Sequence, residues 1–579
     1  TVGMELQTAR LWVEFPAAVV PAADFGPKAC NLVRLSRLSD RLGFDVPAGF
    51  LVPPSVLDEA WAALGLSPVA AADRYASIVQ HGDVAAAEAW RQRVDAMDLP
   101  PSAVTRLQRH YRTLTEHCGS PTVVVRSSFY AEDCAECSCA GLFTSVRDVS
   151  GADALGRAVR AVYASLFAAR TVRYLGAAPR PVAPRMAVIV QRMLGGPSWV
   201  GGVAHSRAPD LATHDLLLIA ASPELDDVTS GATCPEEYLV HRPNLRRGRP
   251  AIVHTTAGTA TAATGFAFDE SSIRPLAALL IDLEHAFGHP LEIEWARAPD
   301  GHLFVLQARP LPALPEPEVT LARSSHDRPL LSGLAVGHGQ FTGTVRRVES
   351  VEQGAHLGSQ DVLVTRRTDA DWDSVLARVG AVISATGGRT SHTARLARER
   401  RSLAVVGCGT QIDRLRDGER ITLVCHDGLD GVVYLANAAA LPTPASTRRR
   451  TRRLRLSHPF AAFSMARAYA PAAVEVDLDQ VCRAMRVPRE SLLTDRAVPP
   501  ALAARIAGCA DVRSFVRARF RDALAIVCTA FPHAEVHALA LSPPDASADS
   551  IDSFQPLLEV AVRELADRFG FQVASLPRT

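Results

Sequence analysis

The segment ATGGRTSHTARLARERRSLAVVG, residues 385–407, decides how the middle of this chain folds. The apolar run AVISA leads into a glycine pair, a pattern typical of a strand that ends in a turn. Thr390 or Ser391 can cap a helix that begins around His392, because a hydroxyl there accepts hydrogen bonds from free backbone N–H groups. The positive end of that helix would stabilise an anion carried by the imidazole. The segment therefore predicts an anion-binding site around a nucleophilic histidine.

The region around this segment, residues 333–438, predicts a compact α/β domain. Its short runs rich in β-branched residues are DVLVTRR, GAVISAT, LAVVGCG, RITLVCH and GVVYLA, and one helix follows Gly388. A lone histidine at the start of a helix is usually a cap or a surface residue. The complete string around His392 favours a site residue instead.

The whole chain is too long for one domain, since it has 579 residues of which 48% are hydrophobic. Residues 313–332 are proline-rich and residues 439–452 are rich in proline and arginine, so we interpret both as linkers. They separate the blocks 1–312, 333–438 and 453–579. The fold class is therefore multidomain, with α/β and α+β parts.

The first block predicts an α+β domain in two subdomains, residues 1–312. Its strongest strands are PTVVVRSS, RMAVIVQRM and HDLLLIAA, and its strongest helical stretch is ALGRAVRAVYASLFAARTVRYL, residues 154–175. The third block predicts a small α/β domain with strands AAVEVDL and EVHALALS and a helix at 553–570. It is too short for a complete eight-unit barrel, which needs about 200 residues or more.

Charge and hydropathy favour small-molecule partners. The chain has 62 Lys and Arg against 61 Asp and Glu, so no overall field attracts nucleic acid or a membrane surface. The arginine run RRRTRRLRL, residues 448–456, has no interleaved aromatic residues, and we interpret it as a solvated linker rather than a nucleic-acid arm. No apolar run reaches about 18 residues, and no secretory signal begins the sequence. We expect a cytoplasmic protein.

The eleven cysteines are scattered, which suits a reducing compartment. Only Cys134, Cys137 and Cys139 cluster. A zinc site would need a fourth ligand at suitable spacing, and none lies nearby. We therefore favour a loop without metal at this cluster.

GGRTSHTARLARE followed by AVVG, together with TDADW at 368–372, resembles the swivelling phosphohistidine domain of the phosphoenolpyruvate synthase and pyruvate phosphate dikinase family. Leu403 stands where that family usually has proline, a packing change that we do not expect to matter. The resemblance implies that His392 carries a phosphoryl group. The residues implied to support it are Gly388, Arg389, Thr390 and Ser391.

FGPKACNLVRLSRLSDRLGFDVPAGFLVP, residues 25–53, and VVVRSSFYAED, residues 123–133, resemble the ATP-grasp nucleotide domain of the same family. The resemblance implies that Lys28 and Arg126 bind the phosphates of ATP, and a guanidinium can hold two phosphate oxygens at once. The alternative for Arg126 is a buried structural pair with a carboxylate.

Two further segments extend this resemblance. AVIVQRML is similar to the strand and hinge beside the adenine, which implies that Gln191 and Met193 contact the base. LEIEWARAPDGHLFVLQARPL, residues 291–311, implies that Glu294 and Gln307 lie on neighbouring strands and offer oxygens to Mg²⁺. Arg309 is implied to reach the phosphates.

The nucleotide block also departs from the family. Glu-Leu-Asp-Asp at 224–227 stands in place of Gly-Leu-Gly-Glu, before a retained Ser-Gly pair. Leu-Phe-Thr-Ser at 142–145 replaces a more polar run, and Ser206 stands where threonine is usual. These departures concern the handling of the γ-phosphate and leave the main cations and metal ligands in place.

The third block resembles drifted units of the family's phosphoenolpyruvate barrel. In the family these strands end in arginines that hold phosphoenolpyruvate, whereas here the corresponding stretches are VEVDLDQ and VHALALS. The part of the barrel that supplies metal-binding carboxylates and an acid/base cysteine is not matched. We therefore expect an acceptor other than pyruvate. Rifampin phosphotransferases are similar in the first two blocks, but they have a large antibiotic-binding domain where this chain has a short linker.

The resemblance implies a dikinase-type phosphotransferase that converts ATP to AMP and phosphate through phosphorylated His392. Its partners would be ATP, Mg²⁺ and a small-molecule acceptor. One alternative is an ATP-driven condensing enzyme that resembles the prodiginine-condensing enzymes. Another is a phosphocarrier, or a degenerate homologue that only binds nucleotide. The oligomeric state stays open.

Overall fold

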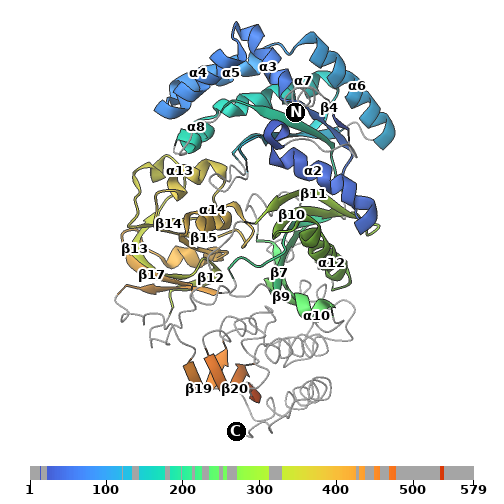
Figure 1. Cartoon of the computed structure of the whole chain (residues 1–579). Coiled ribbons are helices and arrows are strands. Elements are labelled where there is room, and N and C mark those ends of the chain that lie inside the picture. Colours follow the sequence, from blue (N-terminus) through green and yellow to red (C-terminus); the bar gives the residue numbers. More distant parts are fainter. Residues whose placement is uncertain are drawn as a thin grey trace. The chain divides into compact units, whose positions relative to one another are not determined.

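The computed structural model describes residues 13–14, 22–119, 122–132, 142–176, 183–196, 199–210, 215–223, 234–246, 252–256, 270–311, 329–425, 430–436, 449–456, 469–477 and 535–539. The chain forms two compact units (Figure 1). Unit 1 comprises Thr1–Trp199, Leu291–Pro312 and Ala370–Ser374. Unit 2 comprises Val200–Pro290, Ala313–Asp369 and Val375–Thr579.

Unit 1 contains a five-stranded sheet of order β1-β2-β5-β3-β4, in which all neighbours are antiparallel. The strands are β1 (Val13–Glu14), β2 (Gly49–Val52), β3 (Thr122–Phe129), β4 (Val146–Ser150) and β5 (Met186–Arg192). The strands predicted from PTVVVRSS and RMAVIVQRM are confirmed as β3 and β5. These two strands are neighbours in the sheet, and their apolar side chains enter a common core.

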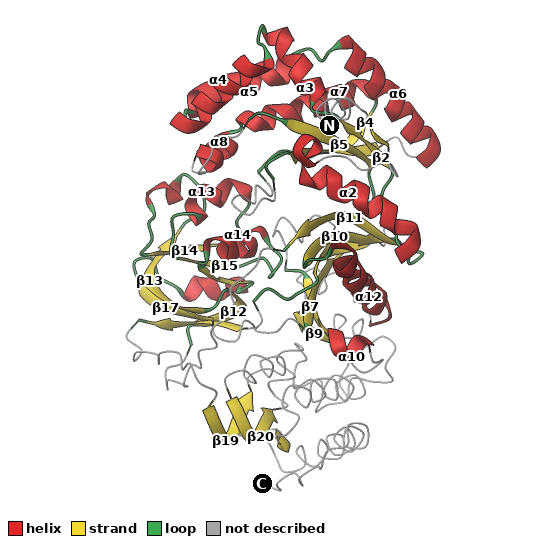
Figure 2. Cartoon of the chain, viewed as in Figure 1, coloured by secondary structure: helices red, strands yellow, loops and turns green. Residues whose placement is uncertain are grey.

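Helices pack around this sheet, as Figure 2 shows. They are α2 (Ala22–Leu42), α3 (Ser55–Ala60), α4 (Pro68–His81), α5 (Val84–Ala96), α6 (Pro101–Cys118), α7 (Ala152–Ala164) and α8 (Ala169–Gly176). Ser67 and Asp83 cap α4 and α5 with their side chains, as short polar residues do at helix starts. Helix α7 contacts β3, β4 and β5, whereas α2 contacts β3 and β5.

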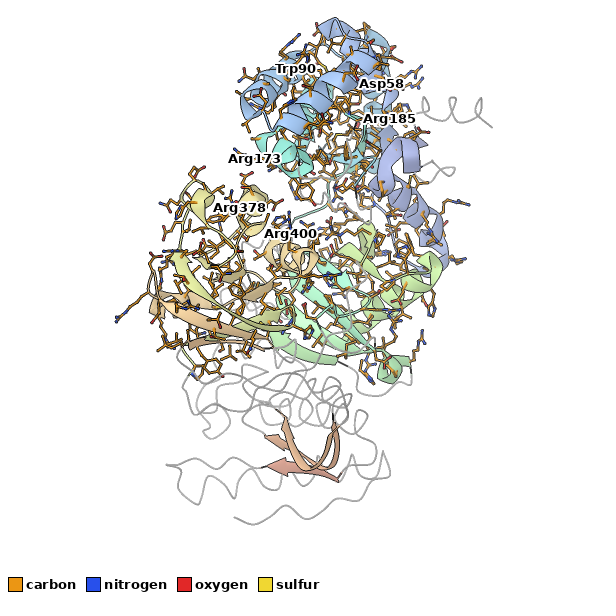
Figure 3. The ribbon with its side chains drawn as sticks, turned by 60° about the vertical axis from the view of Figure 1, so that its left-hand side comes forward. Asp58, Trp90, Arg173, Arg185, Arg378 and Arg400 are labelled. Atoms are coloured by element: carbon orange, nitrogen blue, oxygen red, sulfur yellow. The ribbon has the colours of Figure 1, made fainter. Side chains whose placement is uncertain are left out.

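The helical stretch predicted at 154–175 is interrupted by a short 3-10 turn, Ser165–Phe167. The Ser165 hydroxyl donates to the Val162 carbonyl at 2.6 Å, and the Thr171 hydroxyl donates to the Ser165 carbonyl at 2.8 Å. Such side-chain bonds offer the backbone an alternative to the helix ladder. The turn also directs Phe167 into the core, where its ring stacks on that of Trp90. Trp90 belongs to α5 and is labelled in Figure 3. The break was not predicted.

Helix α2 contains a kink that sets the position of Lys28. Gly26 has a φ of 79°, and a Cβ there would lie 2.7 Å from the Phe129 carbonyl oxygen, so only glycine fits. The Ser128 hydroxyl donates to the Phe25 carbonyl at 2.6 Å and accepts from the Ala29 amide at 3.0 Å. These contacts fix the start of the second helical part against β3.

A hairpin completes unit 1. Its strands β10 (Leu291–Arg297) and β11 (Leu303–Pro310) are antiparallel, which confirms the prediction that Glu294 and Gln307 lie on neighbouring strands. The Asn31 side chain of α2 donates to the Ala308 carbonyl at 3.0 Å. The hairpin is thus attached to the helix that carries Lys28.

Unit 2 begins with four strands that pair consecutively and antiparallel: β6 (Val200–His205), β7 (Leu216–Ser222), β8 (Glu236–His241) and β9 (Ile252–Thr256). The strand predicted from HDLLLIAA is confirmed as β7. Every residue of β6, β7 and β8 is buried. Helix α10 (Arg242–Arg246) follows β8, and α12 (Glu270–Phe287) contacts β7.

A closed barrel of order β12-β16-β15-β14-β13-β17-β18 follows in unit 2. Its strands are β12 (Leu331–Val336), β13 (Gly339–Arg347), β14 (Asp361–Thr365), β15 (Ala381–Ser384), β16 (Leu403–Val406), β17 (Arg420–Cys425) and β18 (Asp430–Leu435). All five strands predicted for this region are confirmed, as is the helix, α14 (His392–Arg400). Helix α14 connects β15 to β16 and contacts β12 and β16. The compact α/β prediction is therefore confirmed.

The third block shows three parallel strands in the order β19-β20-β21. They are β19 (Arg449–Leu456), β20 (Tyr469–Asp477) and β21 (Glu535–Leu539), and the two strands predicted here are confirmed. The interpretation of the arginine run as a linker needs correction, because Arg449–Leu456 forms backbone pairs with β20. The helix predicted at 553–570 lies outside the described residues. Within the described part of the chain, no helix is long and apolar enough to span a membrane.

Candidate functional site

Arg126 joins the two residues that the sequence assigns to Mg²⁺. One guanidinium nitrogen, Nη2, donates to Glu294 Oε2 at 2.8 Å and to Gln307 Oε1 at 2.7 Å. Glu294 and Gln307 are directly opposite each other in the hairpin register. Strands β3, β10 and β11 thus bring all three residues together. The alternative for Arg126, an ion pair with a carboxylate, is also observed. The carboxylate belongs to Glu294, which is itself a predicted metal ligand.

The two other predicted cations are paired with carboxylates as well. Lys28 Nζ lies 2.6 Å from Glu132 Oε1, and Glu132 is completely buried. Arg309 forms an ion pair with Glu292, which is opposite it across the hairpin. The sequence predicted these cations but missed both carboxylates. Glu132 is the second-last residue of the matched string VVVRSSFYAED, and Glu292 is the second residue of LEIE. Their positions inside these two motifs were the available signal.

The oxygens of Glu294 and Gln307 fit a magnesium site. Because both accept from the same nitrogen, they lie close together and face the same point. Carboxylate and amide oxygens are hard ligands, and Mg²⁺ binds few protein ligands while it keeps waters and substrate phosphates. No cluster of three or more His, Cys, Asp or Glu side chains suited to a metal occurs in the described ranges. Two protein oxygens, one from Glu294 and one from Gln307, agree with the small number of protein ligands that Mg²⁺ takes.

Gln191 and Met193 lie at the end of β5. The buried Gln191 side chain donates to the Pro47 carbonyl at 3.2 Å, and the Met193 amide donates to the Thr122 carbonyl at 3.0 Å. These bonds hold the end of β5 to the segment that precedes β2 and to the first residue of β3. The contact of both residues with adenine stays a prediction.

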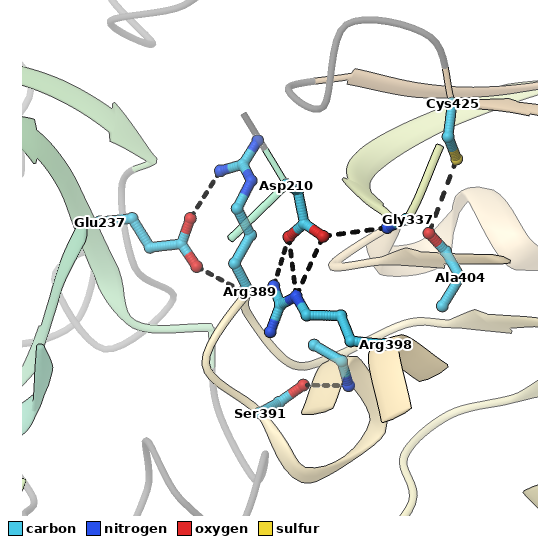
Figure 4. Close-up of polar contacts among 9 residues, drawn as sticks. Asp210, Glu237, Gly337, Arg389, Ser391, Arg398, Ala404 and Cys425 are labelled. Atoms are coloured by element: carbon cyan, nitrogen blue, oxygen red, sulfur yellow. Dashed lines mark hydrogen bonds and ion pairs between the residues drawn. The ribbon is translucent and has the colours of Figure 1, made fainter. Parts of the chain in front are cut away.

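His392 is the first residue of α14, and it is 7% exposed. The Ser391 hydroxyl accepts from the Ala394 amide at 3.4 Å, so the predicted cap is confirmed (Figure 4). Arg395, one turn later, approaches His392 Nδ1 with Nη2 at 2.6 Å. The hydroxyls of Thr368 and Thr393 also form a hydrogen bond beside this turn. His392, the predicted phosphoryl carrier, therefore lies at a capped helix start, and the Arg395 guanidinium contacts one nitrogen of its ring.

The glycine turn before His392 is needed for close packing. Gly387 has a φ of 102°, a conformation that glycine adopts without strain. A Cβ on Gly388 would lie 2.6 Å from Glu237 Oε1 and 2.9 Å from Pro235 Cγ. Gly388 therefore permits the segment around β8 to approach the loop that carries His392.

Arg389 pairs with Glu237 of β8. Its backbone N–H donates to Glu237 Oε1 at 2.6 Å, and its Nη1 donates to Oε2 at 2.7 Å (Figure 4). Both side chains are buried. The Thr390 hydroxyl is buried too and has no hydrogen-bond partner among the described residues. Arg389 thus joins the histidine loop to β8, a contact that the sequence did not predict.

Arg398 and Asp210 form a second buried pair. Arg398 Nε lies 3.0 Å from each Asp210 carboxylate oxygen, and the Gly337 amide donates to Oδ1 at 3.1 Å (Figure 4). Burial alone would raise the pKa of Asp210, but the Arg398 charge and these hydrogen bonds lower it below the usual value. Both pairs connect the barrel to the segment that contains β6 and β8.

Some predicted features lie outside the described residues. They are the cysteine cluster at 134–139, the charged loop at 224–227 and most of the linker at 313–332. The consequences expected from the charged loop therefore stay predictions. Ser206, by contrast, is described, and its carbonyl accepts from Arg242 Nη2 at 2.7 Å.

Two known protein families match this chain, one over the region that contains Arg126 and one over the region that contains His392. Residues 22–327 match the family described as pyruvate phosphate dikinase, AMP/ATP-binding domain. Residues 357–428 match the family described as PEP-utilising enzyme, mobile domain.

Relatives named phosphoenolpyruvate synthase are similar to this chain. The Escherichia coli (strain K12) protein is 32% identical over 376 residues, which cover 59% of this chain and 47% of that protein. The Neisseria meningitidis protein is 30% identical over 437 residues, which cover 69% and 55%. The chain spans about half the length of the curated relatives it matches. With more than half of its residues in the nucleotide-domain match, the chain belongs to the phosphoenolpyruvate synthase and pyruvate phosphate dikinase family.

Proposed function

We propose that this chain is an ATP-dependent phosphotransferase in which His392 carries a phosphoryl group to a small-molecule acceptor. The observation that carries the proposal is the position of His392 at the capped start of α14. Free amides and the helix dipole at that position stabilise the negative charge that a phosphoryl group brings. The separate matches to an ATP-binding domain and a mobile domain support a mechanism in two steps.

At the nucleotide end, Lys28, Arg126 and Arg309 would bind the phosphates of ATP. Glu294 and Gln307 would hold Mg²⁺, which supplies charge neutralisation to the phosphate oxygens when it is bound. Arg126 already contacts both of these oxygen ligands, so it would align the metal position with the phosphate-binding cation. This alignment matters because phosphoryl transfer depends mainly on positioning and electrostatic stabilisation.

In the first step a ring nitrogen of His392 would attack the β-phosphorus of ATP. A P–N bond forms, the P–O bond to AMP breaks with its electrons on the AMP oxygen, and the ring proton leaves to solvent. Water then attacks the terminal phosphorus of the bound pyrophosphoryl group, so that phosphate leaves and one phosphoryl group stays on His392. In the second step an acceptor oxygen attacks the same phosphorus, and the P–N electrons return to the ring. The whole cycle would yield AMP, phosphate and a phosphorylated acceptor.

We infer that the acceptor is not pyruvate. The stretches 474–480 and 536–542, which overlap β20 and β21, contain no arginine that could bind a phosphate and a carboxylate. The relatives named phosphoenolpyruvate synthase match over only about half of their length, so their name does not fix the acceptor of this chain.

The test is the mass of the product when the chain is incubated with ATP, Mg²⁺ and a set of candidate metabolites. A product heavier by one phosphoryl group, together with AMP, supports the proposal. Free phosphate with a new carbon–carbon or carbon–nitrogen bond would favour the condensing alternative instead. A labelled protein that never transfers its label to a small molecule would favour a phosphocarrier. His392→Ala is the control and should give no product.

A further inference from the structure

One nitrogen of Arg126 contacts both oxygens that the proposed site offers to Mg²⁺. This nitrogen, Nη2, lies 2.8 Å from Glu294 Oε2 and 2.7 Å from Gln307 Oε1. Glu294 and Gln307 are directly opposite each other in the β10–β11 hairpin, so their side chains leave the same face of it. All three side chains are largely buried, so solvent screens their charges only in part. A cation of the protein itself therefore lies where the metal ion is expected.

The two contacts use both hydrogens of Nη2. A guanidinium N–H₂ group has two hydrogens, and each of the two oxygens accepts one. A guanidinium holds two oxygens of one phosphate through a pair of its nitrogens, either Nε with Nη2 or Nη1 with Nη2. Both pairs include Nη2. Arg126 therefore cannot make a two-point contact with a phosphate while it donates to both Glu294 and Gln307.

The charges of the three side chains disfavour either ligand alone. Arg126 and Glu294 neutralise each other and Gln307 has no charge, so together they attract a divalent cation only weakly. A metal ion on the same two oxygens would also lie beside a guanidinium of like sign. If the guanidinium turned to a phosphate without metal, the Glu294 carboxylate would instead face an anion. Every charge gains an opposite partner only when metal and nucleotide are both bound.

Resting on the proposed function, we propose that Arg126 occupies the metal position until Mg²⁺ and nucleotide bind together. In this exchange, Glu294 and Gln307 give up the guanidinium and offer their oxygens to the metal ion. Both hydrogens of Nη2 then become available to the phosphate oxygens of ATP. Arg126 thereby couples metal binding to nucleotide binding, and by reciprocity each ligand favours the other by the same factor.

The test measures binding of Mn²⁺, a paramagnetic substitute for Mg²⁺, to the full chain without nucleotide. The signal of free Mn²⁺ in electron paramagnetic resonance gives the dissociation constant. We expect weak binding to the intact chain. Binding to Arg126→Met should be at least about tenfold tighter, since the like charge is removed and the Glu294 carboxylate remains. Adding Glu294→Gln to Arg126→Met should cancel this gain, which would locate the ion at these oxygens.

Two further variants separate charge from packing. Arg126→Gln keeps an amide donor but has no charge, so it should show the same gain in Mn²⁺ affinity as Arg126→Met. Arg185→Met is the matched control, because Arg185 also donates to a carboxylate of unit 1, that of Asp24, at 2.8 Å (Figure 3). It should leave Mn²⁺ binding unchanged.

Thermal unfolding gives a second readout, since a ligand that binds the native chain raises its unfolding midpoint. Mn²⁺ without nucleotide should raise the midpoint of Arg126→Met and of Arg126→Gln by more than that of the intact chain. With α,β-methylene ATP, whose bond to AMP cannot be cleaved, the intact chain should gain more Mn²⁺ affinity than either variant.

Two results would overturn the inference. One is Mn²⁺ binding that is as weak in both Arg126 variants as in the intact chain. The other is tight Mn²⁺ binding by the intact chain without nucleotide. If the intact chain takes no label from ATP, the proposed function fails, while the comparison of Mn²⁺ affinities still decides whether Arg126 occupies the metal position.

Discussion

Glu294 lies directly opposite Gln307 in the β10–β11 hairpin, and both side chains accept hydrogen bonds from one nitrogen of Arg126. A cation and two hard oxygen ligands therefore share one location. In the site proposed above, this arrangement would present a metal and a guanidinium to the same phosphate group. It also means that each of the three residues can be tested separately.

Arg126→Ala should abolish phosphorylation of the protein by ATP. The guanidinium would stabilise charge on the transferring phosphoryl oxygens, and its loss should lower the labelling rate by about a hundredfold or more. Radiolabelling with ATP and Mg²⁺ measures this rate. Arg91→Ala is a suitable control, since Arg91 also pairs with a carboxylate of unit 1 but lies partly exposed on α5, within the same helix as its partner. Normal labelling of the Arg126→Ala variant would remove this residue from the nucleotide site.

Glu294→Gln should raise the Mg²⁺ concentration that gives half-maximal labelling. Glutamine can still accept from Arg126, but it lacks the charge that binds the metal, so we expect a shift of about tenfold or more. A titration of labelling rate against Mg²⁺ measures the shift. Asp300→Asn changes an acidic residue in the turn of the same hairpin and should have no effect. Identical titrations for both variants would refute the proposed metal site.

Local elements of this fold could be predicted from sequence, whereas long-range pairs could not. The strands of the barrel and the cap at Ser391 depend on periodicity and on short polar signals within a few residues. Arg389 and Glu237 are separated by 152 residues, and no local pattern indicates that they meet. Arg126 and Glu294 are 168 residues apart, and only the family resemblance placed them together.

The contact between Arg395 and His392 was also not predicted, but for a different reason. The spacing of Arg395, three residues from His392 on a predicted helix, was visible in the sequence, so the contact could have been inferred. The interruption of the 154–175 stretch could not, because it depends on the packing of Phe167 against three other aromatic rings. The domain boundaries proposed from composition stay predictions.

The buried pair of Asp210 and Arg398 should stabilise unit 2. Asp210→Ala leaves a buried guanidinium without its charge partner, which typically costs about 3–5 kcal/mol. The thermal midpoint of the variant should therefore fall clearly. Combining Asp210→Leu with Arg398→Leu removes both charges and should be less harmful than the sum of the single changes. Additive losses in this double-mutant cycle would contradict a direct pairing.

The same pair should make stability depend on pH. Asp210 has a lowered native pKa, so its stabilising effect is present above the unfolded value of about 4 and is lost as pH falls through the native pKa. The gap between the unfolding midpoints of the intact chain and Asp210→Asn should therefore shrink in acid. Thermal scans from about pH 7 down to pH 3 measure it. A gap that stays constant over this range would show that the Asp210 charge is not the source of the stabilisation.

In the proposed mechanism His392 becomes covalently phosphorylated. The most direct measurement is radiolabelling of the protein by ATP and Mg²⁺ without acceptor, followed by peptide mapping and an acid-lability test. We expect an acid-labile label on the peptide that contains His392. We also expect no label and no acceptor phosphorylation in His392→Ala and His392→Asn, while both variants bind ATP with the affinity of the intact chain. Appreciable phosphoryl transfer by either variant would contradict a phosphohistidine intermediate, because the nucleotide domain would then act on its substrate directly.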